Sequence, residues 1–132
     1  MRLNRKRHKA GRIALSAWPD PVTSQETHML HFTNTAREYV ETGFPGIRVA
    51  TVWAENGEGA DFIEFKAGAR FPLHDHEGPE QILMLSGRIR FGELVLSAGD
   101  FMKIGHGEQH DAEALEDSVF FLAHVGGAII QE

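Results

Sequence analysis

Side chains that can bind a metal ion gather in "HDHEGPE", residues 74–80. In an extended strand, residues i and i+2 point to the same face, so His74 and His76 would direct two imidazoles at one spot while Asp75 points away. The Glu-Gly-Pro turn that follows would let Glu80 open an antiparallel neighbouring strand beside the two histidines. Two imidazoles and a carboxylate form a plausible face of a divalent-metal site.

A fourth ligand would have to come from another strand, and His110 is well placed for this role. It follows the turn "GHGEQ" and precedes the strand-like run "DAEAL". By itself, a His-x-His pattern is more typical of two exposed or structurally satisfied histidines than of a metal site. Three imidazoles and a carboxylate would suit Fe(II), Mn(II), Ni(II), Co(II) or Zn(II), and would leave open positions for water, substrate or dioxygen. We expect iron, with zinc, nickel and manganese as the alternatives.

The elements that must hold these side chains are short strands. Glycine-containing breaks separate many of the strand-like runs, which cover residues 47–54, 61–67, 80–86, 88–92, 93–97, 100–104, 111–115 and 119–125. Short strands at regular spacing with Gly-rich turns are typical of an all-β sandwich or barrel. The one helical candidate is "NTAREYVE", residues 34–41.

Length and composition limit the class of protein. A chain of 132 residues predicts one domain. It contains no cysteine, which excludes a disulfide framework, a thiolate zinc site and a cysteine nucleophile. No apolar run reaches the length of a membrane span, and the basic N-terminus lacks the apolar stretch of a secretory signal. We therefore expect a soluble, cytoplasmic protein.

The charge is divided unevenly along the chain. Residues 1–19 contain six Lys/Arg and no acid, whereas the remainder contains seven Lys/Arg and nineteen acids, a balance of −12. The basic tip fits a flexible, solvated leader, with a nucleic-acid arm or a targeting segment as alternatives. Nucleic acid is not expected as the main partner, because the acidic body lacks the basic face that phosphate binding needs.

The spacing of glycines around the histidines and the glutamate gives a more specific indication. The first conserved motif of the cupin superfamily is matched in full, by Gly68, His74, His76, Glu80 and Gly87. The second motif is matched at Gly99, Gly107 and His110, with Gly105 in place of its proline and Ala114 in place of its asparagine. The chain therefore resembles a small single-domain cupin. Neither departure removes a metal ligand, although the missing asparagine removes a polar contact of the pocket.

This resemblance implies an all-β fold, a single double-stranded β-helix (jelly-roll) barrel. The barrel would occupy residues 34–132, after a basic and partly flexible N-terminal extension, residues 1–33. The family's metal ligands carry over to His74, His76, Glu80 and His110, which would bind one divalent transition metal. Small cupins also resemble one another in forming homodimers, and residues 13–33 would be the segment available for strand exchange.

The short barrel is similar to that of bacterial diketone-cleaving and quercetin-cleaving dioxygenases. This similarity implies a metal-dependent dioxygenase that acts with O₂ on a small diketone-like or enolisable carbonyl or aromatic compound, with Glu80 as a ligand or a catalytic base. The diketone-cleaving type resembles a three-histidine site, whereas here Glu80 is also available. An apolar pocket is expected, with interior candidates Ile82, Met84, Phe91, Phe101, Phe120 and Leu122.

Two other function classes stay open. The run "HDHEGPEQILMLSGRI" also resembles the cupin domain of zinc-binding anti-sigma factors, which implies a non-catalytic sensing or regulatory module. A sugar isomerase or epimerase ranks lowest, because few cations are placed to face the pocket and bind a phosphate. Among the other histidines, His106 is expected in an exposed loop. His124 is expected as a satisfied core histidine, with an acid–base role as the alternative.

Overall fold

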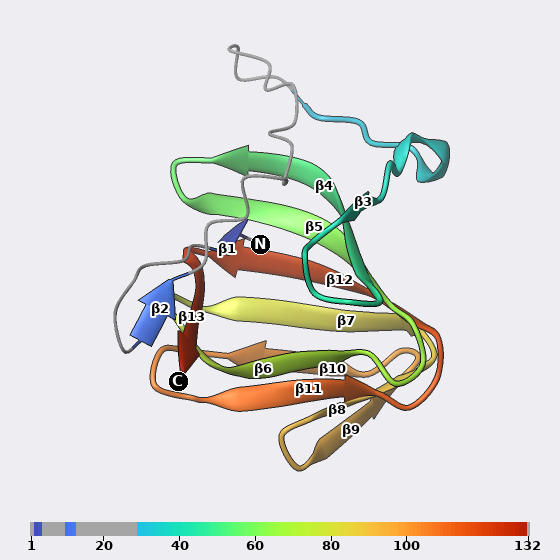
Figure 1. Cartoon of the computed structure of the whole chain (residues 1–132). Helices are drawn as coiled ribbons and strands as arrows, with labels where there is room; N and C mark the ends of the chain where they lie inside the picture. The colour runs from blue at the N-terminus through green and yellow to red at the C-terminus, as the bar shows by residue number, and fades with distance from the viewer. Residues whose placement is uncertain (1, 4–9, 13–28, 132) are drawn as a thin grey trace.

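The computed structural model describes residues 2–3, 10–12 and 29–131, and these form a two-sheet β-barrel (Figure 1). One sheet has the order β1 (Arg2–Leu3), β13 (Gly127–Gln131), β6 (Arg70–His76), β11 (His110–Ala114), β8 (Arg88–Phe91) and β9 (Leu94–Ser97), and β2 (Ala10–Arg12) pairs with β13. The other has the order β10 (Phe101–Ile104), β7 (Glu80–Ser86), β12 (Ser118–Val125), β5 (Glu58–Phe65), β4 (Ile47–Glu55) and β3 (Val40–Glu41). The predicted all-β class is confirmed.

Neighbouring strands in each sheet are mostly distant in the sequence. β6 lies between β11 and β13, and β12 lies between β7 and β5, in antiparallel pairings. These crossovers are those of the expected double-stranded β-helix. They bring the two histidines of β6 beside the start of β11, which no local pairing of consecutive strands would do.

The strands form because apolar and polar residues alternate along them. In β12, the buried side chains are Ser118, Phe120, Leu122 and His124, and the residues between them are partly exposed. A period of two places one set between the sheets and the other outside. Buried apolar side chains from both sheets meet in one continuous core, which includes Ile47, Val49, Ile63, Phe65, Phe71, Ile82, Met84, Ile89, Phe91, Phe120, Leu122 and Ile130.

The predicted helix over residues 34–41 is wrong. The segment contains only a 3-10 turn, Asn34–Ala36, and its last two residues form β3. No side chain caps the turn at Thr33, and so short a segment cannot offset the cost of helix nucleation. Five strands of the structure are missing from the predicted set: the short strands β1, β2 and β3, and the longer strands β6 and β13. The two longer ones were missed because Pro72 and the pair Gly126–Gly127 interrupt the strand pattern.

The predicted division at residue 33 lies largely outside the described residues. Of residues 1–33, the structure describes only 2–3, 10–12 and 29–33, so the flexible basic extension and the strand exchange stay predictions. The described parts β1 and β2 pair with β13 of the same chain. Within the described ranges, no helix is long and apolar enough to cross a membrane.

Candidate metal centre

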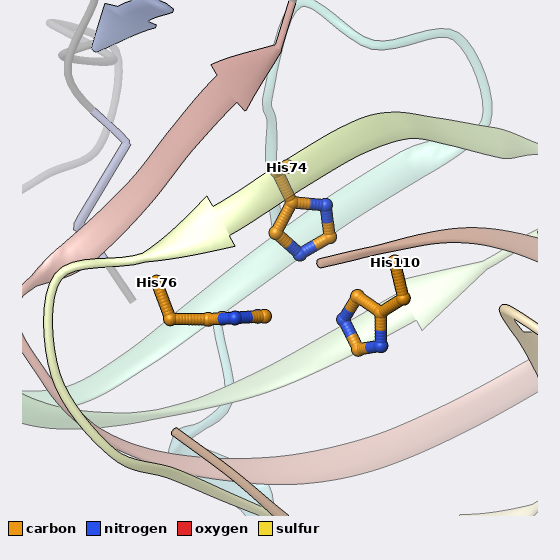
Figure 2. A group of neighbouring side chains, drawn as sticks. All are labelled: His74, His76 and His110. Carbon is orange, nitrogen blue, oxygen red and sulfur yellow. The ribbon is translucent and has the colours of Figure 1, made fainter. Parts of the chain in front are cut away.

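Three histidine side chains converge inside the barrel (Figure 2). His74 and His76 lie on β6, and His110 is the first residue of β11, where it pairs directly with His74. One ring nitrogen from each residue lies within 4.8 Å of those of the other two. The ring centroids are 4.8, 4.7 and 5.0 Å apart, so the imidazoles stand at the corners of a nearly equilateral triangle.

The tautomer of His74 is set by its backbone neighbour. Its Nδ1 lies 2.8 Å from the carbonyl oxygen of Pro72. A carbonyl oxygen only accepts hydrogen bonds, so Nδ1 must hold the proton and Nε2 keeps a free lone pair. A carbonyl that fixes the ring in this way is the usual outer support of a metal-binding histidine.

Burial keeps the three imidazoles neutral. It lowers the pKa of His74 to about 3 and that of His110 to about 4, and each of these shifts is reinforced by neighbouring histidines of the group. Burial also lowers the pKa of His76, which is fully enclosed. Neutral imidazoles with unshared electron pairs are the form that binds a metal ion.

Glu80 lies beside this group but outside the triangle. It is the first residue of β7, it is 3% exposed, and its Oε1 lies 3.5 Å from His76 Nε2. Its other oxygen, Oε2, is buried and has no hydrogen-bond partner among the described residues. Burial raises the pKa of the Glu80 carboxyl to about 7.

These residues fit a divalent cation. Buried polar atoms are nearly always hydrogen-bonded, so the unpartnered Glu80 Oε2 and His76 Nε2 are exceptions that require an explanation. A cation between the imidazoles would satisfy both atoms and would favour the ionised form of Glu80. The three-histidine group therefore suits a divalent metal, while the full ligand set His74, His76, Glu80 and His110 stays a prediction.

The loop that leads to His110 is fastened to β6 from outside. Asp75 points away from the metal group, and its Oδ1 accepts hydrogen bonds from Gly107 N and His76 N, at 2.8 and 2.7 Å. His106 is exposed, as expected, but its Nδ1 lies 2.7 Å from the carbonyl oxygen of His76. The β10–β11 loop is therefore held against the strand that supplies the other two histidines.

His124 is a buried histidine with its own partners. Its Nδ1 lies 2.8 Å from the carbonyl oxygen of Gly126, and its Nε2 lies 3.3 Å from Asp61 Oδ2. A Cβ on Gly59 would lie 3.1 Å from His124 Nε2, so the glycine leaves room for the ring. His124 also pairs with Glu80 across the sheet. It is thus the satisfied core histidine that the sequence suggests, beside the candidate centre.

An apolar cavity of about 30 Å³ lies next to His74, Glu80 and His110. Its walls include five phenylalanines, namely Phe44, Phe65, Phe71, Phe91 and Phe120. Ile82 and Leu122 line it as expected, but Met84 is a core residue outside the lining and Phe101 is 59% exposed on the outer face. Thr42, Phe44 and Phe71 are lining residues that the sequence did not indicate, because they come from a turn and from the strand interrupted by Pro72.

The arginines near the centre point outward and form ion pairs. Arg90 binds Asp111 at 2.9 Å, Arg70 binds Glu113 at 3.0 Å, and Arg88 binds Glu116. Among the described residues that line the cavity, there is no lysine or arginine. The walls therefore suit a neutral, apolar ligand better than a phosphorylated one.

The two-sheet jelly-roll barrel with converging imidazoles inside agrees with the match to a cupin family model, which assigns the chain to the cupins. More narrowly, the family model described as the ChrR cupin-like domain matches residues 21–129, and the chain belongs to this family. A comparison with curated proteins gives no significant match.

Solved structures show the same fold. KdgF from Halomonas sp. is 28% identical, with a TM-score of 0.61 over 71% of this chain and 93% of that chain. An acetylacetone dioxygenase from Acinetobacter johnsonii is 15% identical, with a TM-score of 0.66 over 84% of this chain and 81% of that chain. The complex of Rhodobacter sphaeroides SigE with the anti-sigma ChrR contains a chain that is 23% identical, with a TM-score of 0.62 over 70% of this chain and 50% of that chain.

Proposed function

We propose that this cupin binds one divalent transition metal through His74, His76, Glu80 and His110, and that it is a dioxygenase for a small, enolisable carbonyl compound. The observation that supports this proposal is the apolar cavity beside three convergent, neutral imidazoles. Iron is the proposed metal, because it suits this donor set and can react with dioxygen.

The bound metal would supply a Lewis acid for the substrate oxygens and an open position for dioxygen. The chain's own residues would do the rest. The phenylalanine walls would enclose the carbon skeleton and exclude water. Glu80 is also the proposed catalytic base: with its pKa near 7, the carboxyl would accept the proton that an enolisable substrate releases on binding.

Metal content of untagged protein purified without oxygen is the first test. We expect near-stoichiometric iron by mass spectrometry, and oxygen consumption when the protein is mixed with a panel of diketones and flavonols. Tightly held zinc without oxygen consumption would contradict the dioxygenase proposal. No bound metal, even after reconstitution, would contradict the ligand assignment itself.

A regulatory module is the second candidate, and the family assignment favours it. The family is named after ChrR, and a chain in the SigE–ChrR complex shares this fold. Under this proposal, the metal would be zinc and its loss would change the binding of a partner protein. The sugar isomerase or epimerase gains no support, because the described lining holds no cation for a phosphate.

We also propose a homodimer in the cytoplasm. In support of the dimer, Phe101 and Leu83 are paired across β10 and β7 and are 59% and 39% exposed on the outer face. Apolar side chains grouped in this way commonly mark an interface. Light scattering coupled to size-exclusion chromatography should give twice the mass of the chain, and a mass of one chain would contradict the dimer.

A further inference from the structure

The cavity is much smaller than the substrates proposed for it. A volume of about 30 Å³ is about a fifth of the ~150 Å³ of an apolar cavity that takes up benzene. A carbonyl compound of five or more carbons, which is about as large as benzene, needs more space than that. A wall of the cavity must therefore move before such a ligand can reach the histidines.

Among the five phenylalanines that line the cavity, Phe44 has the side chain with the most freedom to move. Phe65, Phe71, Phe91 and Phe120 lie on strands and are at most 5% exposed. Phe44 lies instead in the connection between β3 and β4, and it is only partly buried. One side of its ring already borders solvent, so the ring can turn outward without disturbing a strand.

The backbone under Phe44 is held firmly. Residues Phe44–Ile47 read "FPGI" and form a turn in which Ile47 N donates to Phe44 O at 3.1 Å. Pro45 and Gly46, with Gly46 at φ +77°, are the residues that a type II turn requires. The Thr42 hydroxyl donates to Ile47 O at 2.8 Å and accepts from Phe44 N at 3.2 Å. Motion is therefore confined to the Phe44 side chain.

Ring contacts connect Phe44 to the candidate metal centre. Phe44 meets Phe71 edge to face at 4.8 Å, and Phe71 meets His74 edge to face at 4.7 Å. A single aromatic ring thus separates the partly exposed Phe44 from a candidate metal ligand. Displacing the Phe44 ring would enlarge the cavity beside Phe71, one ring away from His74.

We propose that the Phe44 ring is the gate of the cavity and sets the size of the ligand that reaches the centre. The ligands admitted are neutral compounds with an apolar body, because the walls are phenylalanine and aliphatic side chains and the Thr42 hydroxyl is already bonded. The identity of the substrate as a carbonyl compound rests on the proposed function. The gate itself does not, because it concerns access to the cavity.

Benzene binding to the full chain loaded with Zn(II) tests the gate without any catalysis. Methyl NMR shifts of the lining residues Ile63, Ile82 and Leu122 would report occupancy. We expect Phe44→Ala to bind benzene at least about tenfold more tightly than the wild type, since an apolar cavity lined by hydrocarbon takes up benzene. Phe62→Ala is the matched control, because Phe62 is also partly buried but lies outside the lining, against Phe121.

Equal benzene affinity in the wild type and folded Phe44→Ala would overturn the gate. If Phe44→Ala fails to fold, Phe44→Leu replaces it and should give a smaller gain, and no gain would overturn the gate equally. In an oxygen-consumption assay, Phe44→Ala should raise kcat/KM for bulky diketones relative to acetylacetone. Metal content after reconstitution separates the two proposals. A wild type that binds no metal contradicts the proposed function, whereas benzene binding to that metal-free chain and to its Phe44→Ala variant still tests the gate.

Discussion

The two ends of the barrel interior have opposite chemistry, although the same strands build both. On β6, the inward residues pass from His76 and His74 to Phe71. Four other strands follow the same order, from polar to apolar: Glu80 to Met84 on β7, His124 to Phe120 on β12, Asp61 to Phe65 on β5, and His110 to Ala114 on β11.

Cross-strand register aligns these gradients. Glu80 faces His124 across β7 and β12, and Met84 faces Phe120 further along the same pair. On this strand pair, the register therefore places two buried polar groups in one layer and two apolar side chains in the next. The comparison teaches that one end of the barrel holds the candidate metal ligands, while the other holds the apolar packing and the phenylalanine walls of the cavity. The two can therefore be disrupted separately.

His76→Ala should produce the largest effect. It should abolish metal binding at the polar end of the barrel interior and leave the apolar end folded. Removal of one imidazole from the triangle should cost more than the 10–100-fold in metal affinity typical of losing an outer support. We expect the purified variant to lack stoichiometric metal by mass spectrometry and to keep the far-UV circular dichroism of a β protein. His31→Ala, at an exposed histidine, is the control. Stoichiometric metal in His76→Ala would refute the ligand assignment.

Phe120→Ala should break the apolar end alone. Phe120 is 4% exposed and contacts Phe65 and Phe91, with ring centroids 5.8 and 5.7 Å away. Truncation of such a ring costs about 3–5 kcal/mol of unfolding free energy, measured by urea denaturation. Leu94→Ala, at a residue that is 61% exposed, should cost less than about 0.5 kcal/mol. Metal bound per folded molecule should be unchanged in both, and its loss in Phe120→Ala would mean that the two ends are not separable.

Glu80→Gln should produce the smallest effect. It tests whether the Glu80 carboxylate binds the metal or only lies beside the three histidines. Burial raises the pKa of Glu80 to about 7. Below that pH, a metal must displace a proton from the carboxyl, so metal affinity should rise about tenfold per pH unit from pH 5.5 to 7 and then level off. The pKa values of His74 and His110 lie near 3 and 4, so they add no slope there. Competition titrations that show the same slope in Glu80→Gln would exclude Glu80 as a ligand.

Local spacing in the sequence predicted the all-β class and the meeting of the three histidines. It worked because a period of two fixes which side chains share a face, and because the cupin spacing links residue 74 to residue 110. Phe44 and Thr42 could not be predicted, since their place in the lining depends on how the β3–β4 turn folds over the barrel. Phe101 was placed inside wrongly: its run "DFMKI" alternates, and only the pairing with Leu83 shows which face is outside.

The Asp75 carboxylate, which ties Gly107 to the end of β6, has a consequence for energetics. The three imidazoles come from two separate strands, yet the hydrogen bonds of Asp75 hold the loop before His110 against β6 in the folded chain. A cation that binds here would then meet donors whose conformational entropy has already been lost. Cation binding would therefore raise the free energy of unfolding, by an amount that grows with the logarithm of the free cation concentration. A melting temperature followed against free metal concentration would therefore be a binding isotherm of the site.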